Sequence, residues 1–366
     1  MTDDFFEIDF LAVETAKSGD AITLRYKVNG ATRIHVVDGG YSETGETLVE
    51  HIKTYYGAPN HIENVVLTHP DGDHAGGLKT LLDSDEFQIG ALWMNRPWLY
   101  AAELLPSFKN YTSVDRLAAK LKEIYSHTAE LEEKALEKGI PIREAFQGAV
   151  IGAFTVLAPS KARYLSLVLD SPRTPETTEA RASAMTAMLE GIMKAMATAK
   201  NLVKSAWGEE TFSPNGTSRE NEMSIIQYAY LSGKRIVLTG DAGREALEEA
   251  ANYAPWVGLA LPGVDRFQVP HHGSRRNVST DILDRWLGER LPQRPAAGST
   301  TFSAFISSAK ADPDHPRKSV ERAFHHRGAA VLATEGQSIC TSGGSAPTRS
   351  GWVAIPGREY PEEQEE

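Results

Sequence analysis

The chain has 366 residues, of which 41% are hydrophobic and 24% are charged, and this balance excludes global disorder and supports a large buried core. Its formal net charge of −11 opposes general attraction to polyanions such as DNA or anionic lipid, although a local basic groove would escape that argument. The lone cysteine, Cys340, excludes an intrachain disulfide and multi-cysteine zinc sites. No apolar run approaches the roughly 20 residues needed to span a bilayer, and the acidic N-terminus lacks a secretory pattern. We therefore expect a cytoplasmic protein that is not embedded in a membrane.

The first part of the chain predicts alternating strands and helices. Short β-branched runs separated by glycine and aspartate predict a β-meander at residues 8–13, 21–28 and 32–37. A capped segment with apolar residues at helical spacing predicts a helix at 42–57, and an apolar strand follows at 62–68. The remaining elements expected here are a helix at 77–82, a strand at 90–95, a long amphipathic helix at 114–138 and a strand at 149–157.

A helical segment interrupts this alternation. Residues 180–207 carry an apolar stripe of Met185, Met188, Leu189, Ile192 and Met196, which indicates a core or oligomer contact, with a lid over a substrate groove as the alternative. The flanking segments 160–179 and 208–219 are rich in turn residues and predict loops. We therefore expect a helical insertion at about 160–219.

The second half of the chain resumes the alternation. The acidic tail at 356–366 has no apolar face to bury, so we expect it to be disordered. The expected elements are strands at 224–231, 235–239 and 266–269 and helices at 243–253 and 280–287.

The strongest chemical signal is Thr68-His69-Pro70-Asp71-Gly72-Asp73-His74-Ala75-Gly76-Gly77, between a predicted strand and a predicted helix. Two imidazoles and two carboxylates in this turn are metal-ligand types, although a solvated turn with a helix cap at Asp73 would explain the motif alone. Two other predicted strand ends carry similar groups, Asp241 after Gly240 and the pair His271-His272 before Gly273-Ser274. The coincidence of three such strand ends favours a metal site over a structural role.

Together these motifs resemble the metallo-β-lactamase superfamily, and specifically its branch related to the hydrolase domain of the competence DNA-uptake protein ComEC. The resemblance extends from about residue 8 to residue 336, with an interruption at 160–219. It implies an α/β fold of the αββα type, in which two mixed sheets pack face to face and form one domain over 1–355. Weaker matches to the same branch are Gly19-Asp20-Ala21, Val37-Asp38-Gly39-Gly40 and Asn221-Glu222-Met223-Ser224.

The resemblance also implies two divalent metal ions. Asp241 would bridge them, and Asp38 would orient the site by hydrogen bonding behind the ligands. The implied ligands are His69 and Asp71 for one metal, Asp73 and His74 for the other, and either His271 or His272 to complete the second site.

Two features depart from the superfamily pattern. The commoner residue at the position of Asp71 is histidine, and the harder oxygen ligand weakens the preference for zinc. Between His74 and Asp241 the only histidine is His127, in a predicted mid-helix, so the separate third-motif histidine is missing. We therefore expect zinc to be favoured, with manganese or magnesium as alternatives, and one metal to be held less firmly.

The predicted catalytic residues are Asp73, His272 and His315. A hydroxide held between two cations is a good nucleophile near neutral pH, and the resemblance implies this chemistry. His315 lies in an Asp-His-Pro segment that matches a His-Pro of the ComEC-like branch. It would bind an oxyanion or protonate a leaving group, while a plain surface position is equally open.

We therefore expect a metal-dependent hydrolase, in first place a phosphodiesterase or nuclease. Nucleic acid would contact a local basic edge at Arg266, Arg275 and Arg276. One alternative is a hydrolase of small esters, lactones or thioesters, and another is a non-catalytic metal-binding regulatory module. The oligomeric state is left open.

Overall fold

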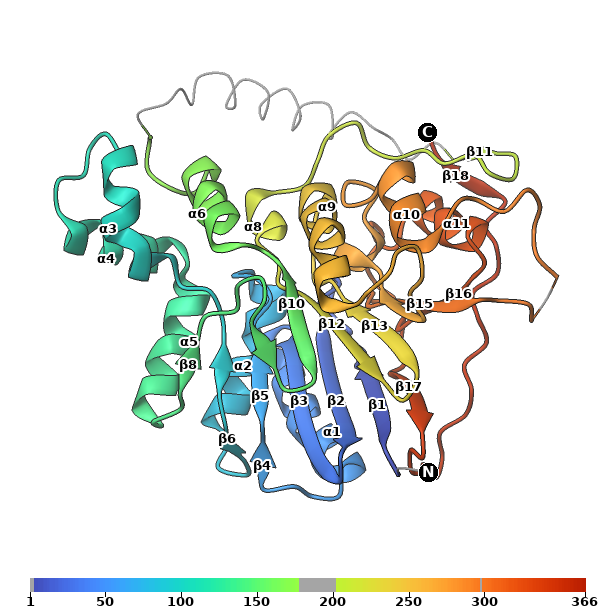
Figure 1. Cartoon of the computed structure of the whole chain (residues 1–366), viewed down its shortest axis with the longest axis horizontal. Helices are drawn as coiled ribbons and strands as arrows, with labels where there is room; N and C mark the ends of the chain where they lie inside the picture. The colour runs from blue at the N-terminus through green and yellow to red at the C-terminus, as the bar shows by residue number, and fades with distance from the viewer. Residues whose placement is uncertain (1–2, 178–201, 297) are drawn as a thin grey trace.

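The computed structural model describes residues 3–177, 202–296 and 298–366, so most of the predicted helix at 180–207 lies outside the described residues. The fold is a four-layer αββα sandwich of the metallo-β-lactamase type, which confirms the predicted fold class (Figure 1). Two seven-stranded sheets pack face to face with helices on their outer faces. In the part of the chain that is described, no helix is long and apolar enough to cross a bilayer.

The first sheet is antiparallel at one side and parallel at the other. Strands β17, β1, β2 and β3 pair antiparallel, and β3, β5, β7 and β8 continue in parallel. Helices α1 (Gly45–Tyr55), α2 (Gly72–Asp83) and α5 (Ser126–Glu137) pack on its outer face. The strand order is β17 (Ile339–Gly344), β1 (Phe5–Phe10), β2 (Ala21–Val28), β3 (Ala31–Gly39), β5 (Asn64–Val66), β7 (Leu92–Trp93) and β8 (Ile142–Arg143).

The second sheet repeats this mixed plan. Strands β13, β14, β15 and β16 are parallel, and β13, β12, β10 and β9 are antiparallel. Helices α9 (Arg244–Tyr253), α10 (Thr280–Leu287) and α11 (Lys318–His326) cover its outer face. The strand order is β16 (Ala329–Ala333), β15 (Phe302–Ile306), β14 (Arg266–Gln268), β13 (Lys234–Leu238), β12 (Ile226–Leu231), β10 (Phe154–Ala158) and β9 (Val150–Ile151).

The core between the sheets follows from the alternation of side chains along each strand. In β1, Phe6, Ile8 and Phe10 enter the inter-sheet core, where the ring of Phe10 stacks on Phe305 at a centroid distance of 4.7 Å. Asp9, between Ile8 and Phe10, belongs to the opposite face of the strand and is also fully buried. This strand is therefore covered on both faces.

The predicted metal ligands follow parallel strands. His69 follows β5 and Asp38 is near the end of β3, which pairs in parallel with β5. Asp241 and His271 follow β13 and β14, which are also parallel neighbours. Because the carboxyl ends of parallel strands lie at the same edge of a sheet, the fold collects these residues at one edge of the sandwich.

A group of short helices, here termed the helical cap, has a core of its own. Its central residues include Trp98, Leu117, Tyr164 and Met223. In Figure 1 its α3 and α4 project to the left of the sheets, and α6 and α8 lie above them. The cap comprises residues 97–125, 161–177 and 219–223, with η2 (Pro97–Tyr100), α3 (Ala101–Leu104), η3 (Leu105–Ser107), α4 (Val114–Ile124), α6 (Lys161–Asp170) and α8 (Arg219–Glu222).

Several predicted elements differ from the structure. The single helix expected at 114–138 is two helices, because the backbone of Tyr125 leaves the helical region at ψ 51°. The loop expected at 160–179 contains α6, whose N-terminus is capped by the side chain of Ser160. Helix α2 begins at Gly72 and not at residue 77, which places Asp73 and His74 in its first turn.

The acidic tail predicted to be disordered is ordered in the structure. Its residues form β18 (Glu363–Glu365), which pairs antiparallel with β11 (Leu202–Lys204), a strand where the sequence predicted helix. The carboxylate of Glu365 accepts hydrogen bonds from the backbone nitrogens of Lys318 and Ser319 at the start of α11. The remaining short elements are β4 (His61–Ile62), β6 (Gln88–Ile89), η1 (Ser42–Thr44), η4 (Ala254–Val257) and η5 (Pro270–Gly273).

Candidate metal centre

Asp241 lies at the meeting point of four imidazoles. Its Oδ2 atom is 3.7 Å from His69 Nε2 and 3.6 Å from His271 Nε2. Its Oδ1 atom is 3.3 Å from His74 Nε2 and 3.7 Å from His272 Nε2. Each oxygen of this buried carboxylate therefore faces its own pair of ring nitrogens.

Two further aspartates extend the two sides of this cluster. Asp71 Oδ2 is 3.7 Å from His69 Nε2, and Asp73 Oδ2 is 3.7 Å from His272 Nε2. Two ligand atoms bound to one tetrahedral zinc at about 2.0–2.1 Å are roughly 3.3–3.4 Å apart, so these spacings suit a shared cation better than direct hydrogen bonds. The two sides are His69, Asp71 and His271, and Asp73, His74 and His272, with Asp241 between them.

Hydrogen bonds behind the rings determine which nitrogen faces Asp241. His272 Nδ1 is 2.9 Å from the main-chain oxygen of Ser307, which only accepts, so this Nδ1 carries a proton. His74 Nδ1 donates to Asp38 Oδ2 at 2.7 Å. In both rings Nε2 is therefore the nitrogen available to a metal.

Asp38 also orients the third ring through Thr68. The backbone nitrogen and the hydroxyl of Thr68 both donate to the Asp38 carboxylate, at 2.8 and 2.6 Å. Because the hydroxyl proton is used in this way, Thr68 Oγ1 accepts from His69 Nδ1 at 3.1 Å. His69 Nε2 is thereby directed into the cluster like the others. Asp38 therefore hydrogen-bonds to His74 directly and contacts His69 through Thr68.

The inward-facing atoms lack hydrogen-bond partners. Among the described residues, the Nε2 atoms of His69, His74 and His272 and the Oδ1 atom of Asp241 are buried without such a partner. Leaving even one buried polar group unpaired costs about 1–3 kcal/mol, so four at one point require an explanation. Divalent cations bound between them would satisfy all four, and the residues present therefore fit a metal centre.

The two adjacent histidines reach opposite sides of the cluster through an unusual turn. His271 and His272 both have left-handed backbone conformations, with φ of 47° and 54°. His271 Nδ1 lies 2.8 Å from Asn221 Nδ2 and 3.0 Å from Asn277 Oδ1, which hold the ring. The sequence left open which histidine joins the cluster, and the structure brings both to Asp241.

The charges of the cluster are strongly coupled. Burial disfavours the charged form of Asp241, but His271, His74 and His272 outweigh it and hold the pKa of Asp241 well below its usual value. Burial likewise opposes protonation of His74, but Asp241 and Asp38 raise the pKa of His74 well above its usual value. The carboxylates thus favour positive charge in this space, and divalent cations would provide it.

His315 lies beside the cluster rather than on an isolated surface loop. Its ring stacks on that of His271 with centroids 5.4 Å apart, and its Nδ1 is 3.1 Å from Asp312 Oδ2. Burial, followed by the neighbouring His272 and His271, lowers the pKa of His315 to about 4. The imidazole is therefore neutral at pH 7.

The predicted basic edge is largely engaged elsewhere. Arg266 donates to Thr341 Oγ1 on β17 at 2.8 Å, at the end of β14 remote from His271. Arg275 donates to the main-chain oxygen of Glu366 at 2.7 Å, and Arg276 is exposed. A different arginine reaches the cluster: Arg173 Nη1 is 2.8 Å from Asp71 Oδ1.

The motifs in the sequence did not predict the involvement of Arg173, Asn277 and Ser307. Each contacts a residue of the cluster that is between 6 and 102 positions away in the chain, and none belongs to a recognisable metal-binding motif. Only Asn221 carried a signal, as part of a weak match to the ComEC-like branch.

A family model described as the metallo-β-lactamase superfamily matches residues 26–138 of the chain. No curated protein matches the chain. The hydrolase AbOPH of the β-lactamase superfamily is similar at 12% identity and a TM-score of 0.33, over 68% of this chain and 75% of that one. A putative metallo-β-lactamase from Thermotoga maritima has 12% identity and a TM-score of 0.29, over 65% and 81%. A diphosphatase from the PhnP family has 10% identity and a TM-score of 0.35, over 92% and 98%.

Proposed function

We propose that this chain of the metallo-β-lactamase fold is a metal-dependent hydrolase that cleaves phosphodiester bonds. The observation that supports the metal-dependent activity best is Asp241, whose two oxygens each face a separate pair of imidazole Nε2 atoms. One carboxylate that bridges two ligand groups is the arrangement expected of a two-cation site. The proposed ligands are His69, Asp71 and His271 on one side, Asp73, His74 and His272 on the other, and Asp241 between them.

The ligand types bear on the choice of metal. Imidazole nitrogens favour zinc, whereas the three carboxylates of Asp71, Asp73 and Asp241 also suit manganese or magnesium. We propose zinc first, with the harder ions as alternatives. We propose that His271 supplies the imidazole that the separate third-motif histidine would have supplied. Among the described residues, Asp73, His74, Asp241 and His272 form a compact group that could hold a metal ion, so we expect the metal on the side of His69 and Asp71 to be held less firmly.

When bound, two divalent cations activate water near neutral pH and stabilise negative charge on the reacting oxygens. The chain's own residues prepare the site for them. Asp38 and the carbonyl of Ser307 hold His74 and His272 with Nε2 facing inward. Neutral His315, stacked beside His271, is placed to accept a proton from, or hydrogen-bond to, a bound substrate.

The preference for phosphodiesters rests on two arguments. Two-cation sites suit in-line displacement at phosphorus, because the cations stabilise both the attacking and the leaving oxygen. The spacing of His69, Asp71, Asp73 and His74 resembles the ComEC-like branch, which is linked to DNA. We therefore propose membership of that branch, with nucleic acid as one phosphodiester substrate. The lone cysteine is consistent with a cytoplasmic location.

The test compares wild type with Asp73→Asn, which keeps the side-chain shape but removes a ligand charge. Metal content by elemental analysis is measured together with cleavage of bis(p-nitrophenyl) phosphate and of single-stranded DNA. Asp83→Asn is the matched control, because Asp83 ends the same helix, is exposed and pairs with Lys134 away from the cluster. We expect about two bound metals and phosphodiester cleavage in wild type and control, and loss of both in Asp73→Asn.

Other results would redirect the assignment. Bound metal with cleavage of p-nitrophenyl acetate or a lactone, but of no phosphodiester, would indicate a small-ester hydrolase. Stoichiometric metal without turnover of any ester would indicate a binding or regulatory module. Absence of metal from protein prepared with zinc or manganese would show that the central proposal is wrong.

A further inference from the structure

Arg173 brings a cation to the rim of the metal centre. It lies in the loop that follows α6 of the helical cap, and its Nη1 is 2.8 Å from Asp71 Oδ1. The other oxygen of Asp71 faces His69 Nε2 at 3.7 Å. The guanidinium thus pairs directly with Asp71, one of the proposed metal ligands.

A buried carboxylate holds Arg173 in this position. Glu220 Oε2 is 3.7 Å from Arg173 Nε, and the Glu220 side chain is only 1% exposed. Ser171, two residues before Arg173, donates to the other oxygen of Glu220. Glu220 belongs to α8, on the far side of the insertion in the sequence. The two flanks of the insertion therefore meet beside Asp71.

The guanidinium retains capacity for a ligand. Within the described residues, its contacts with Asp71 and Glu220 use Nη1 and Nε, and 44% of the side chain is exposed. A planar guanidinium can bind two oxygens of a phosphoryl group at once, and it stays charged at every relevant pH. Once Asp71 shares its charge with a metal ion, the charge of Arg173 is less fully neutralised, so an anion is attracted to this side of the centre.

We propose that Arg173 binds the anionic phosphoryl group of the substrate beside the metal centre and so selects phosphodiesters over neutral esters. This inference rests on the proposed function. It replaces the basic edge expected from the sequence, where Arg266 and Arg275 donate to other parts of the chain.

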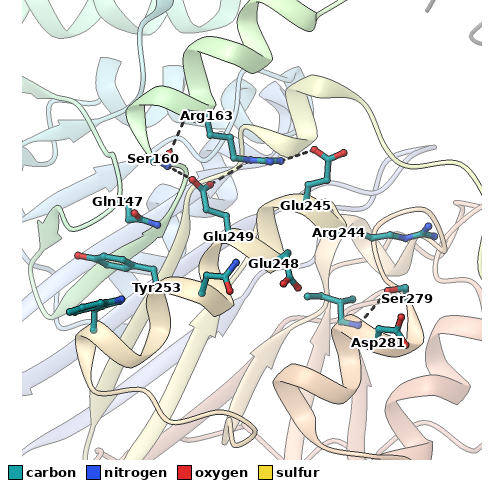
Figure 2. A pocket seen from close by; sticks show the side chains of 13 residues that line it. Gln147, Ser160, Arg163, Arg244, Glu245, Glu248, Glu249, Tyr253, Ser279 and Asp281 are labelled. Atoms are coloured by element: carbon teal, nitrogen blue, oxygen red, sulfur yellow. Dashed lines mark hydrogen bonds and ion pairs between the residues drawn. The ribbon is translucent and has the colours of Figure 1, made fainter.

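Arg163 provides a matched control from the same part of the cap. It lies on α6, and its guanidinium pairs with Glu222, Glu245 and Glu249. Figure 2 shows Arg163 reaching between Glu245 and Glu249, over α9. None of these carboxylates belongs to the proposed metal ligands. A general effect of losing an arginine from the cap should therefore appear in Arg163 variants as well.

The kinetic test uses Arg173→Met, Arg173→Lys and Arg163→Met as metal-loaded proteins. We expect Arg173→Met to raise KM for bis(p-nitrophenyl) phosphate by about 10- to 100-fold, the range for one charge-assisted hydrogen bond. Hydrolysis of neutral p-nitrophenyl acetate and metal content should not change. Arg173→Lys should recover part of the loss, because a point charge replaces the fork. An unchanged KM in Arg173→Met, or an equal rise in Arg163→Met, would overturn the proposal.

A binding measurement keeps this inference separate from the proposed function. Titration calorimetry with inorganic phosphate on the metal-loaded proteins requires no turnover. We expect phosphate affinity to fall about 10-fold or more in Arg173→Met and to persist in Arg163→Met, even if wild type cleaves no phosphodiester. Equal phosphate affinity in wild type and Arg173→Met contradicts the inference. So does a fall in metal content in both Arg173 variants, because Arg173 would then only position Asp71.

Discussion

Two buried carboxylate clusters, one on the outer face of the first sheet and one at the edge of the sandwich where both sheets contribute residues, are completed in different ways. On the outer face of β1, Asp9 accepts from Arg349 at 2.6 and 2.9 Å and from Tyr56 at 2.6 Å. Glu7 accepts from Arg349 at 3.0 Å and from Arg25 at 2.7 Å. All four carboxylate oxygens thus have a donor within the chain.

At the metal centre the balance is different. Three of the imidazoles around Asp241 are held from behind, His74 by Asp38, His272 by Ser307 and His69 by Thr68, but in the described part of the chain their Nε2 atoms have no hydrogen-bond partner. Burial of charge is therefore common to both clusters and does not identify function. The distinguishing feature is a rigid set of groups whose partner is absent from the chain, because such a set is prepared for a ligand.

The largest expected effect is on activity at the metal centre. Asp241→Asn removes the charge that both sides share, so we expect loss of at least one metal and a fall in kcat/KM of about 1000-fold or more. Elemental analysis and phosphodiester kinetics measure the two effects. Asp265→Asn is the control, because Asp265 pairs with Arg235 at the opposite end of β13 and β14 from Asp241 and His271. If Asp241→Asn retained both metals and its activity, the cluster around Asp241 would not differ from the Asp9 cluster in the way described above.

The next largest effect is on the stability of the protein, through the buried cluster of Glu7, Asp9 and Arg349. Arg349→Met leaves Asp9 and Glu7 buried without their main cation, and we expect unfolding free energy to fall by about 3–5 kcal/mol. Urea denaturation measures this change. Arg285→Met is the control, since its pair with Glu248 is largely exposed and should contribute no more than about 1 kcal/mol. Metal content of the folded protein should stay unchanged, and equal destabilisation by both variants would contradict this prediction.

A second buried cluster, formed by Glu210, His326 and Arg327, gives a pH-dependent contribution to stability. Burial opposes the charge of Glu210, but hydrogen bonds from His326 and Arg327 outweigh it and lower the pKa of Glu210 from 4.5 to about 2. Because the folded pKa lies below the unfolded one, the stabilisation is complete above about pH 4.5 and is lost as the pH falls toward 2. We expect about 3 kcal/mol at pH 7 and roughly half of that at pH 3.

This prediction is measured as the difference in unfolding free energy between wild type and Glu210→Gln at several pH values. The difference should shrink as the pH falls from 5 to 3. A difference that is independent of pH would show that the Glu210 charge does not contribute to stability.

The smallest expected effect is on metal affinity when Asp38, which hydrogen-bonds to Thr68 and His74, is changed. Asp38 has a left-handed backbone with φ of 58°, which asparagine tolerates, so Asp38→Asn should preserve the turn. The amide accepts at only one atom, and it would fail to serve both Thr68 and His74. We expect metal affinity to fall about 10- to 100-fold, as measured by competition with a chromogenic chelator. Unchanged affinity would show that this support is unnecessary.

The strand-end motifs could be predicted from the sequence because the residues of each motif are close together in the chain. His69, Asp71, Asp73 and His74 lie on one turn, and Asp241 follows a recognisable apolar strand. The sequence did not decide between His271 and His272, because two adjacent side chains normally point in different directions. Only the pair of left-handed residues brings both rings to one carboxylate.

Other features depended on contacts between distant residues. Nothing in the acidic tail predicts a strand, since β18 is stabilised by pairing with β11 and by Glu365 at the start of α11. Arg173 likewise acquires its position from Glu220 and Asp71, which are 47 and 102 positions away. The break at Tyr125 has no glycine or proline to mark it, so the helical pattern appeared continuous.

The left-handed turn at His271 and His272 has a consequence for laboratory evolution. Two successive non-glycine residues with φ of 47° and 54° each cost roughly 1–2 kcal/mol. Glycine at either position would relieve that cost and remove an imidazole from the cluster. Selection for heat resistance alone would therefore favour the exchange, and selection for catalysis would oppose it. Thermostable variants should be screened at these two codons before their activity is compared.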